Sequence, residues 1–237
     1  MTDKFIRVKG ASRINVKIVE SSGQVSDLNF PGATITADEI VKFENTLFAL
    51  AQSHQIFVIA GSLPQGVSPE QLALWIETLQ KAGKKVFFDS SNIALAAGVK
   101  ARPYLIKPND EELSALVGQT LSSTHDIKSA AEKLQQQGCE NVVISLGEKG
   151  VLWLNQAGWI ESTPPKMTVV STVGAGDTLV AGLCWAELNQ WSKAQSLSFA
   201  TALAALAVSQ IGVGVEDIKQ VQAIQESVQI RSQLING

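Results

Sequence analysis

Apolar and polar residues alternate in the first part of the chain. Between residues 12 and 20, apolar side chains take every second position, while Arg13 and Asn15 occupy positions of the opposite face. A period of two is typical of a β-strand with one solvated face. Residues 21–24 then indicate a turn, and residues 25–30 a returning strand. The pattern therefore predicts an antiparallel hairpin.

From Pro31 onward, helical and strand patterns alternate. Capping residues begin helices at Thr36 and Ser68, and glycines end helices at Gly83 and Gly138. The predicted helices cover residues 36–52, 68–83, 126–137, 177–189 and 193–209, and two more open near 109 and 216. The predicted strands cover residues 56–60, 85–89, 104–106, 141–146 and 151–155, the first as a buried strand. Repeated β-then-α units predict an α/β fold in which a parallel sheet carries helices on both faces.

Ligands of such sheets bind outside the carboxyl ends of the strands. Polar residues or glycines follow the predicted strands at these ends. They are Gly61 and Ser62, Asp89 and Ser90, Lys107 to Asn109, Ser145 to Gly147, and the turn at Gly174. We therefore expect the functional site to form along this edge.

The most informative of these segments runs from Ser171 to Thr178. It follows Val169 and Val170, which indicate a strand, and it precedes a long apolar helical pattern. Glycines let the backbone approach a phosphate, and the free N–H groups of a helix N-terminus attract anions. Asp177 would then accept a proton from an attacking hydroxyl while the amides of the turn hold a phosphoryl group. The alternative is a tight turn whose acid only favours the helix dipole.

Lys107 to Glu112 follows a predicted strand and opens a helix. Asn109 is a good N-cap, and Glu112 occupies the partner position of a capping box. In the functional alternative, their oxygens bind a phosphate-associated Mg²⁺ through water, and Lys107 offsets phosphate charge. These residues alone leave both interpretations open.

Three other segments have both a structural and a functional interpretation. Residues 145–150 form either a glycine-containing hairpin turn or a loop whose backbone passes close to a nucleotide. Ser62 belongs either to an ordinary βα loop or to a contact with a substrate hydroxyl or phosphate. Arg13 and Asn15 either face water or, where their face closes over a site, hold a substrate phosphate, which a guanidinium binds through two hydrogen bonds.

Composition excludes several classes of protein. The 237 residues are 45% hydrophobic and 17% charged, which supports an extensive core, and a net charge of −3 without a basic run gives no sign of a nucleic-acid or membrane partner. Two separate cysteines, Cys139 and Cys184, indicate reduced thiols. His54 and His125 form no cluster with them, so a general base is expected to be a carboxylate or a lysine.

The order and residues of these motifs resemble the ribokinase/PfkB family of sugar kinases over residues 5–215. The motifs are Ser12 to Lys17, Ala60 to Pro64, Phe88 to Ser91, Lys107 to Glu112, Val143 to Gly150 and Val170 to Asp177. The resemblance implies a ribokinase-like fold, with one kinase domain over residues 1–237 and residues 5–31 as part of a small antiparallel β lid. It also implies a cytoplasmic enzyme that uses ATP and Mg²⁺ to phosphorylate a sugar phosphate, and the motifs are most similar to members acting on fructose 1-phosphate.

The same resemblance implies a role for each candidate residue. Asp177 is the base that deprotonates the sugar 6-hydroxyl, and the anion hole for the transferring phosphoryl group consists of the amides of Gly174, Ala175 and Gly176. Asn109 and Glu112 belong to a magnesium motif. The residues expected at the nucleotide are Lys107, Ser145, Leu146, Gly147, Glu148, Gly150 and Gly176. Those expected at the sugar phosphate are Arg13, Asn15 and Ser62, together with Asp177.

The chain departs from the family pattern before the predicted hairpin. It has no counterpart of the family's first strand, or of the glycine-rich loop that grips the sugar, so we expect the N-terminal part of the fold to be missing. Ser171 stands where many sugar kinases have aspartate. The alternatives are kinases of the same family that act on tagatose 6-phosphate or fructose 6-phosphate, and an inactive nucleotide-binding fragment. Because relatives often dimerise through the lid, a homodimer is also expected.

Overall fold

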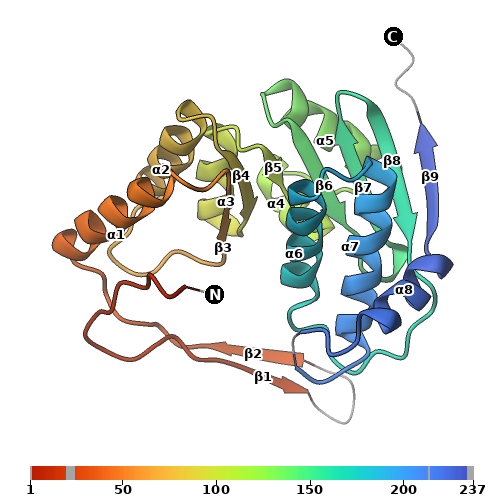
Figure 1. The fold of residues 1–237 in the computed structure, drawn as a ribbon, viewed down its shortest axis with the longest axis horizontal. Helices are drawn as coiled ribbons and strands as arrows, with labels where there is room; N and C mark the ends of the chain where they lie inside the picture. Colours follow the sequence, from red (N-terminus) through yellow and green to blue (C-terminus); the bar gives the residue numbers. More distant parts are fainter. Residues whose placement is uncertain (1, 20–24, 213, 234–237) are drawn as a thin grey trace.

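The computed structural model describes residues 2–19, 25–212 and 214–233, and its central feature is a seven-stranded sheet (Figure 1). In spatial order the strands are β3 (Ile56–Ala60), β4 (Lys85–Asp89), β5 (Leu105–Ile106), β6 (Asn141–Ser145), β7 (Val151–Asn155), β8 (Gly158–Thr163) and β9 (Gln229–Gln233). The pairings from β3 to β6 are parallel and those from β6 to β9 antiparallel. Because β8 runs in the direction of β6, five of these seven strands point the same way, as the prediction of a mostly parallel sheet requires.

The antiparallel part of the sheet begins where the connection becomes short. Only residues 146–150 separate β6 from β7, whereas a parallel crossover needs a dozen or more residues. Neither β8 nor β9 was predicted from the sequence patterns. Strand β9 contains a single apolar residue, Ile230, so its sequence lacks the alternation that marks a strand.

Helices cover both faces of the sheet, as predicted. One face carries α1 (Ala37–Leu50), α2 (Pro69–Lys81), α3 (Asn92–Lys100), α4 (Asp110–Val117) and α5 (Thr124–Gln136). The other carries α6 (Ala175–Leu188) and α7 (Lys193–Val208), and α8 (Ile218–Ser227) packs against α7. Neighbouring residues of β4 show the division, since Phe88 packs with the first group of helices and Phe87 with the second. No helix in the described ranges is long and apolar enough to cross a membrane.

The predicted caps form, and one helix was missed. Thr36 and Glu39 make both bonds of a capping box at α1, and the Ser68 hydroxyl accepts from the Gln71 N–H at α2. Helix α3 was not predicted, because its N-cap makes no side-chain hydrogen bond and it contains Gly98 in its interior. That glycine is required by packing, since a Cβ there would lie 2.2 Å from the Phe88 ring.

The predicted hairpin forms, but its exposure differs from expectation. Strand β1 (Asn15–Val19) pairs antiparallel with β2 (Val25–Asn29), while the predicted turn at residues 21–24 lies outside the described residues. We call this hairpin the lid. It projects away from the sheet (Figure 1), and its apolar Ile14 and Ile18 are 59% and 45% exposed, so the prediction of only one solvated face is wrong.

Two further predictions of strands are corrected. Strand β3 forms but is an edge strand rather than a buried one, and Val58 is 48% exposed. An apolar run of five residues does not by itself distinguish these cases. Val169 and Val170 form no strand and are exposed; the Val170 N–H instead donates to the Val208 carbonyl at the end of α7, over 2.7 Å.

Candidate active site

Four parallel strands end together and bring the predicted polar residues to one edge of the sheet. In the register of the strands, Ala60 lies beside Asp89, and Phe88 lies beside Ile106, which in turn lies beside Val142. Ser62, Asp89, Lys107 and Ser145 therefore follow or end neighbouring strands at the same edge. This is the position at which ligands of α/β sheets bind.

The glycine turn enters this edge from α6. Gly174 is the N-cap and adopts φ 78° and ψ 0°, a left-handed conformation that favours glycine. The Ala175 N–H donates to the Thr172 carbonyl over a long 3.4 Å, whereas those of Gly174, Gly176 and Asp177 have no acceptor among the described residues. Free amides at the positive end of a 14-residue helix are suited to bind an anion.

Lys107 lies against this turn. Its side chain is only 6% exposed, and its Nζ forms an ion pair with the Asp89 carboxylate at 3.2 Å. A Cβ on Gly176 would lie 3.3 Å from the same Nζ, so the absence of a side chain there lets the ammonium approach the helix start. The anion site thus combines free backbone amides with a buried positive charge.

Asp89 is a residue of the site to which the sequence analysis gave no role. Burial raises the pKa of its carboxyl group; Lys107 acts in the opposite direction, and the nearby carboxylates of Glu112 and Asp177 add to the rise. Asp89 therefore pairs with Lys107 while the charges of two other site carboxylates act on it. The sequence signals for Asp89 were its place at the end of a predicted strand and within the motif from Phe88 to Ser91.

Asn109 and Glu112 form the capping box of α4. The Glu112 N–H donates to the Asn109 Oδ1 at 2.7 Å, and the Asn109 N–H donates to the Glu112 Oε2 at 2.9 Å. The structural interpretation of this motif is therefore confirmed. The second carboxylate oxygen of Glu112 has no hydrogen-bond partner among the described residues and lies in a half-buried position.

That oxygen suits Mg²⁺, which prefers oxygen ligands and retains several waters. In the described part of the chain, no three potential metal-ligating side chains of His, Cys, Asp or Glu gather into a site. An ion here would consequently depend on water and phosphate oxygens as well as on Asn109 and Glu112.

The loop predicted to line a nucleotide adjoins this segment. Asn109 and Ser145 form an isolated parallel bridge, and the Ser145 N–H donates to the Pro108 carbonyl at 3.1 Å. Residues 146–150 close the β6–β7 hairpin with a 3₁₀ turn at Gly147–Lys149, so the predicted hairpin turn is confirmed. Gly150 packs on the neighbouring strand, because a Cβ there would lie 1.8 Å from the Ser162 carbonyl oxygen.

Three of the four residues predicted at the sugar phosphate, Arg13, Asn15 and Ser62, come together although Ser62 is distant in sequence from the other two. The Arg13 Nε donates to the Asn15 Oδ1 at 2.8 Å, and its Nη1 donates to the Ser62 Oγ, 49 positions away. These contacts connect the start of the lid to the loop after β3. All three residues remain exposed, so their polar groups are accessible to a ligand.

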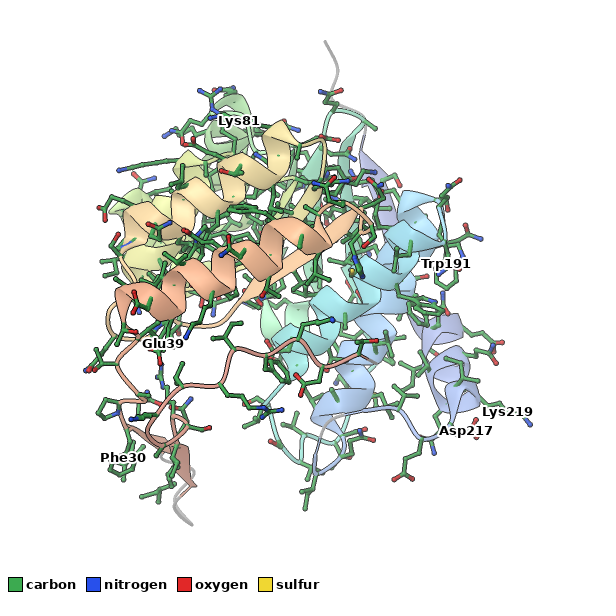
Figure 2. All side chains as sticks on the ribbon, turned by 60° about the vertical axis from the view of Figure 1, so that its left-hand side comes forward. Phe30, Glu39, Lys81, Trp191, Asp217 and Lys219 are labelled. Carbon is green, nitrogen blue, oxygen red and sulfur yellow. The ribbon has the colours of Figure 1, made fainter. Side chains whose placement is uncertain are left out.

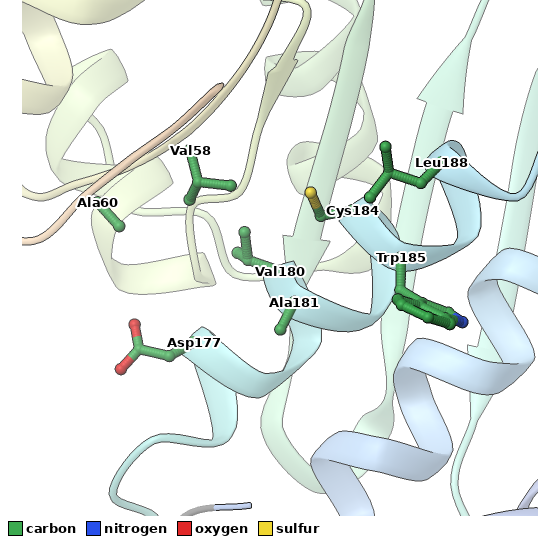
Figure 3. A pocket seen from close by; sticks show the side chains of 8 residues that line it. All are labelled: Val58, Ala60, Asp177, Val180, Ala181, Cys184, Trp185 and Leu188. Atoms are coloured by element: carbon green, nitrogen blue, oxygen red, sulfur yellow. The ribbon is translucent and has the colours of Figure 1, made fainter. Parts of the chain in front are cut away.

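Asp177 borders an open groove between β3 and α6, shown in Figure 3. The groove has a volume of about 480 Å³ and is otherwise lined by apolar or sulfur-containing side chains: Val58, Ala60, Val180, Ala181, Cys184, Trp185 and Leu188. The Asp177 carboxylate points away from the helix and has no hydrogen-bond partner among the described residues (Figure 3). None of the other predicted site residues lines this groove.

The edge of the sheet, the glycine turn and the buried lysine together define an α/β protein with a site suited to phosphate groups. The chain matches the pfkB family of carbohydrate kinases over residues 2–219 and therefore belongs to that family. The family and the ribokinase-like fold predicted from the motifs are thus confirmed.

Two relatives and one solved structure show how close the similarity is. The 1-phosphofructokinase of Vibrio cholerae is 56% identical over 228 residues, which are 96% of this chain and 72% of the relative. The 1-phosphofructokinase of Haemophilus influenzae is 49% identical over 231 residues, 97% of this chain and 74% of the relative. The crystal structure of phosphofructokinase-2 from Escherichia coli in complex with potassium matches with a TM-score of 0.85 and 32% identity, over 94% of this chain and 72% of that one.

Proposed function

We propose that the chain is a cytoplasmic kinase that transfers the γ-phosphoryl group of ATP to the 6-hydroxyl of fructose 1-phosphate. The products are fructose 1,6-bisphosphate, ADP and the proton released by the hydroxyl. The observation that carries the proposal is the buried Lys107 ammonium against the glycine turn, whose free amides begin α6 beside Asp177. The similarity to enzymes named 1-phosphofructokinase supports this choice of sugar.

Asp177 is the proposed general base. It removes the proton of the sugar 6-hydroxyl as the oxygen attacks phosphorus, and the N–H groups of Gly174, Ala175 and Gly176 stabilise charge on the transferring group. The Ala175 amide is also engaged with Thr172, so the Gly174 and Gly176 amides are the more available donors. Phosphoryl transfer of this kind depends mainly on positioning and electrostatics.

The nucleotide is proposed to lie between Lys107 and the β6–β7 turn. Lys107 offsets the charge of the phosphates, and the backbone from Ser145 through Leu146, Gly147 and Glu148 to Gly150 lines the ATP. Asn109 and Glu112 would hold Mg²⁺ through water. When bound, this ion neutralises charge on the ATP phosphates.

The substrate assignment is tested with a panel of sugars on this chain. ADP release from Mg-ATP is measured with fructose 1-phosphate, fructose 6-phosphate, tagatose 6-phosphate and no sugar. We expect the highest kcat/KM with fructose 1-phosphate. A higher value with another sugar would reassign the substrate, and ATP binding without sugar-dependent turnover would identify an inactive nucleotide-binding fragment.

Arg13 is proposed to bind the 1-phosphate from the lid. We expect Arg13→Met to raise the KM for fructose 1-phosphate by about 10–100-fold, the usual worth of a charge-assisted hydrogen bond. ATP affinity, measured by calorimetry, should stay unchanged. Arg7→Met is the matched control, since Arg7 is exposed and its ion pair among the described residues is with nearby Asp3. An unchanged KM in the Arg13 variant would remove this residue from the substrate site.

The lid is also proposed to form a homodimer with a second copy of the chain. Val16 and Leu28 lie opposite each other in the hairpin, so one face of the lid gathers apolar side chains at alternate positions. The exposed apolar residues of this face are Ile14, Val16, Ile18, Leu28 and Phe30. Figure 2 shows Phe30 on the part of the chain that projects away from the helices. Exposed apolar patches of this kind mark interaction surfaces.

The dimer proposal predicts the effect of one charge on the lid. The unmodified chain should sediment as a dimer, and Ile18→Lys should yield monomers, because the new ammonium would be buried without a partner in the interface. Val41→Lys introduces the same charge at an exposed apolar residue of α1 and should leave the dimer intact. Dimers that persist in the Ile18 variant would contradict an interface through the lid.

A further inference from the structure

Asp89 and Lys107 form an ion pair that is largely withdrawn from solvent. The two side chains are 14% and 6% exposed, and their closest oxygen and nitrogen atoms are 3.2 Å apart. A buried pair is poor evidence for stability, because the cost of desolvation offsets the attraction between the charges. The pair lies at the ends of β4 and β5, directly beneath the start of α6.

Lys107 has a limited choice of partners in this position. The carboxylates of Glu112 and Asp177 raise the pKa of the Asp89 carboxyl group, and Asp177 follows Gly176, where a Cβ would lie 3.3 Å from the Lys107 Nζ. Glu112 is held by the backbone N–H of Asn109 in the capping box. This bond fixes the position of the Glu112 carboxylate, whereas the Asp177 carboxylate makes no hydrogen bond with the described residues and can turn toward the lysine if Asp89 is absent.

We propose that Asp89 is a positioning residue, which holds the Lys107 ammonium against the glycine turn and keeps it from pairing with Asp177. This inference rests on the proposed roles of Lys107 and Asp177 and adds the residue on which both depend. An ammonium bound to Asp177 would occupy the lone pairs that the reaction needs for the proton of the sugar hydroxyl. Held by Asp89, the same ammonium faces the phosphates instead.

The test is a double-mutant cycle of Asp89→Asn and Lys107→Met. The rate of ADP release gives kcat, and calorimetry gives the Kd of ATP for each variant. Asp89→Asn should lower kcat about tenfold and change the Kd by less than about threefold, because the lost contact is compensated by the loss of a negative charge near the phosphates. Lys107→Met should weaken ATP binding about tenfold or more, and the double variant should match Lys107→Met within about twofold in kcat.

The outcomes separate this inference from the assignment of the site. If Lys107→Met altered neither ATP affinity nor kcat, the proposed site itself would be wrong. If Lys107→Met were impaired while Asp89→Asn kept the kcat of the unmodified chain, only the role of Asp89 would be overturned. If Asp89→Asn lowered kcat a further tenfold in the Lys107→Met background, Asp89 would act independently of the lysine. That result would also overturn its positioning role.

Folding and charge are controlled separately. Asp38→Asn makes the same change at an exposed residue of α1 and should not affect kcat. Circular dichroism and the Tm establish that each variant is folded. Asp89→Glu preserves the charge and should retain more activity than Asp89→Asn; if the asparagine variant does not fold, the glutamate variant replaces it in the cycle under the same criteria.

Discussion

Replacement of Asp177 by asparagine is expected to lower kcat by about 10²–10⁴-fold, which is the rate acceleration that a general base usually contributes. Asparagine has the same shape but cannot accept the proton of the sugar hydroxyl. The carboxylate makes no hydrogen bond with the described residues, so its replacement should leave the fold and the affinity for ATP intact. The measurement is ADP release under saturating ATP and fructose 1-phosphate, with the Kd of ATP obtained by calorimetry.

The control for this prediction addresses the structural alternative. Asp177 lies in the first turn of α6, where an acid also interacts favourably with the helix dipole. Asp38 also lies in the first turn of its helix, α1, so Asp38→Asn reports what loss of a dipole interaction does by itself. If Asp177→Asn retained a kcat close to that of the Asp38 variant, Asp177 would be only a favourable helix residue.

The predictability of the fold followed the strength of local signals. Strands β4, β6 and β7 and the helices with strong caps were predicted close to their observed bounds because their patterns are determined by nearby residues. Helix α3 and strand β9 were missed because neither carries such a pattern. The edge position of β3 depends on which strands lie beside it, and this is a property of the whole sheet rather than of residues 56–60.

In the site, too, motifs of consecutive residues were predictable from the sequence, whereas contacts between residues far apart in the chain were not. The glycine turn and the capping box at Asn109 were recognisable because each occupies fewer than ten consecutive residues. The contact of Arg13 with Ser62 spans 49 positions, and residue spacing alone could not predict it. The partner of Lys107 was equally hidden, since Asp89 and Lys107 meet only after β4 and β5 pair.

Gly150 is expected to be the most sensitive glycine of the β6–β7 turn. It adopts φ 102° and ψ −143°, a region that is nearly restricted to glycine, and a Cβ would lie 1.8 Å from the Ser162 carbonyl oxygen. Strain and overpacking each cost about 1–3 kcal/mol, so Gly150→Ala should lower the free energy of unfolding by roughly 2–5 kcal/mol. Urea denaturation followed by circular dichroism measures this change.

Gly147 provides the matched comparison within the same turn. Its φ of 58° lies in the left-handed region, but a Cβ there would meet no atom within 4 Å. Gly147→Ala should therefore lower the free energy of unfolding by only about 1–2 kcal/mol. Both glycines are proposed to line the ATP, and the pair therefore separates two reasons for a glycine. If Gly150→Ala kept its stability but bound ATP weakly, close approach of the nucleotide would be the reason for Gly150; loss of stability would assign that glycine to the packing of the turn on β8.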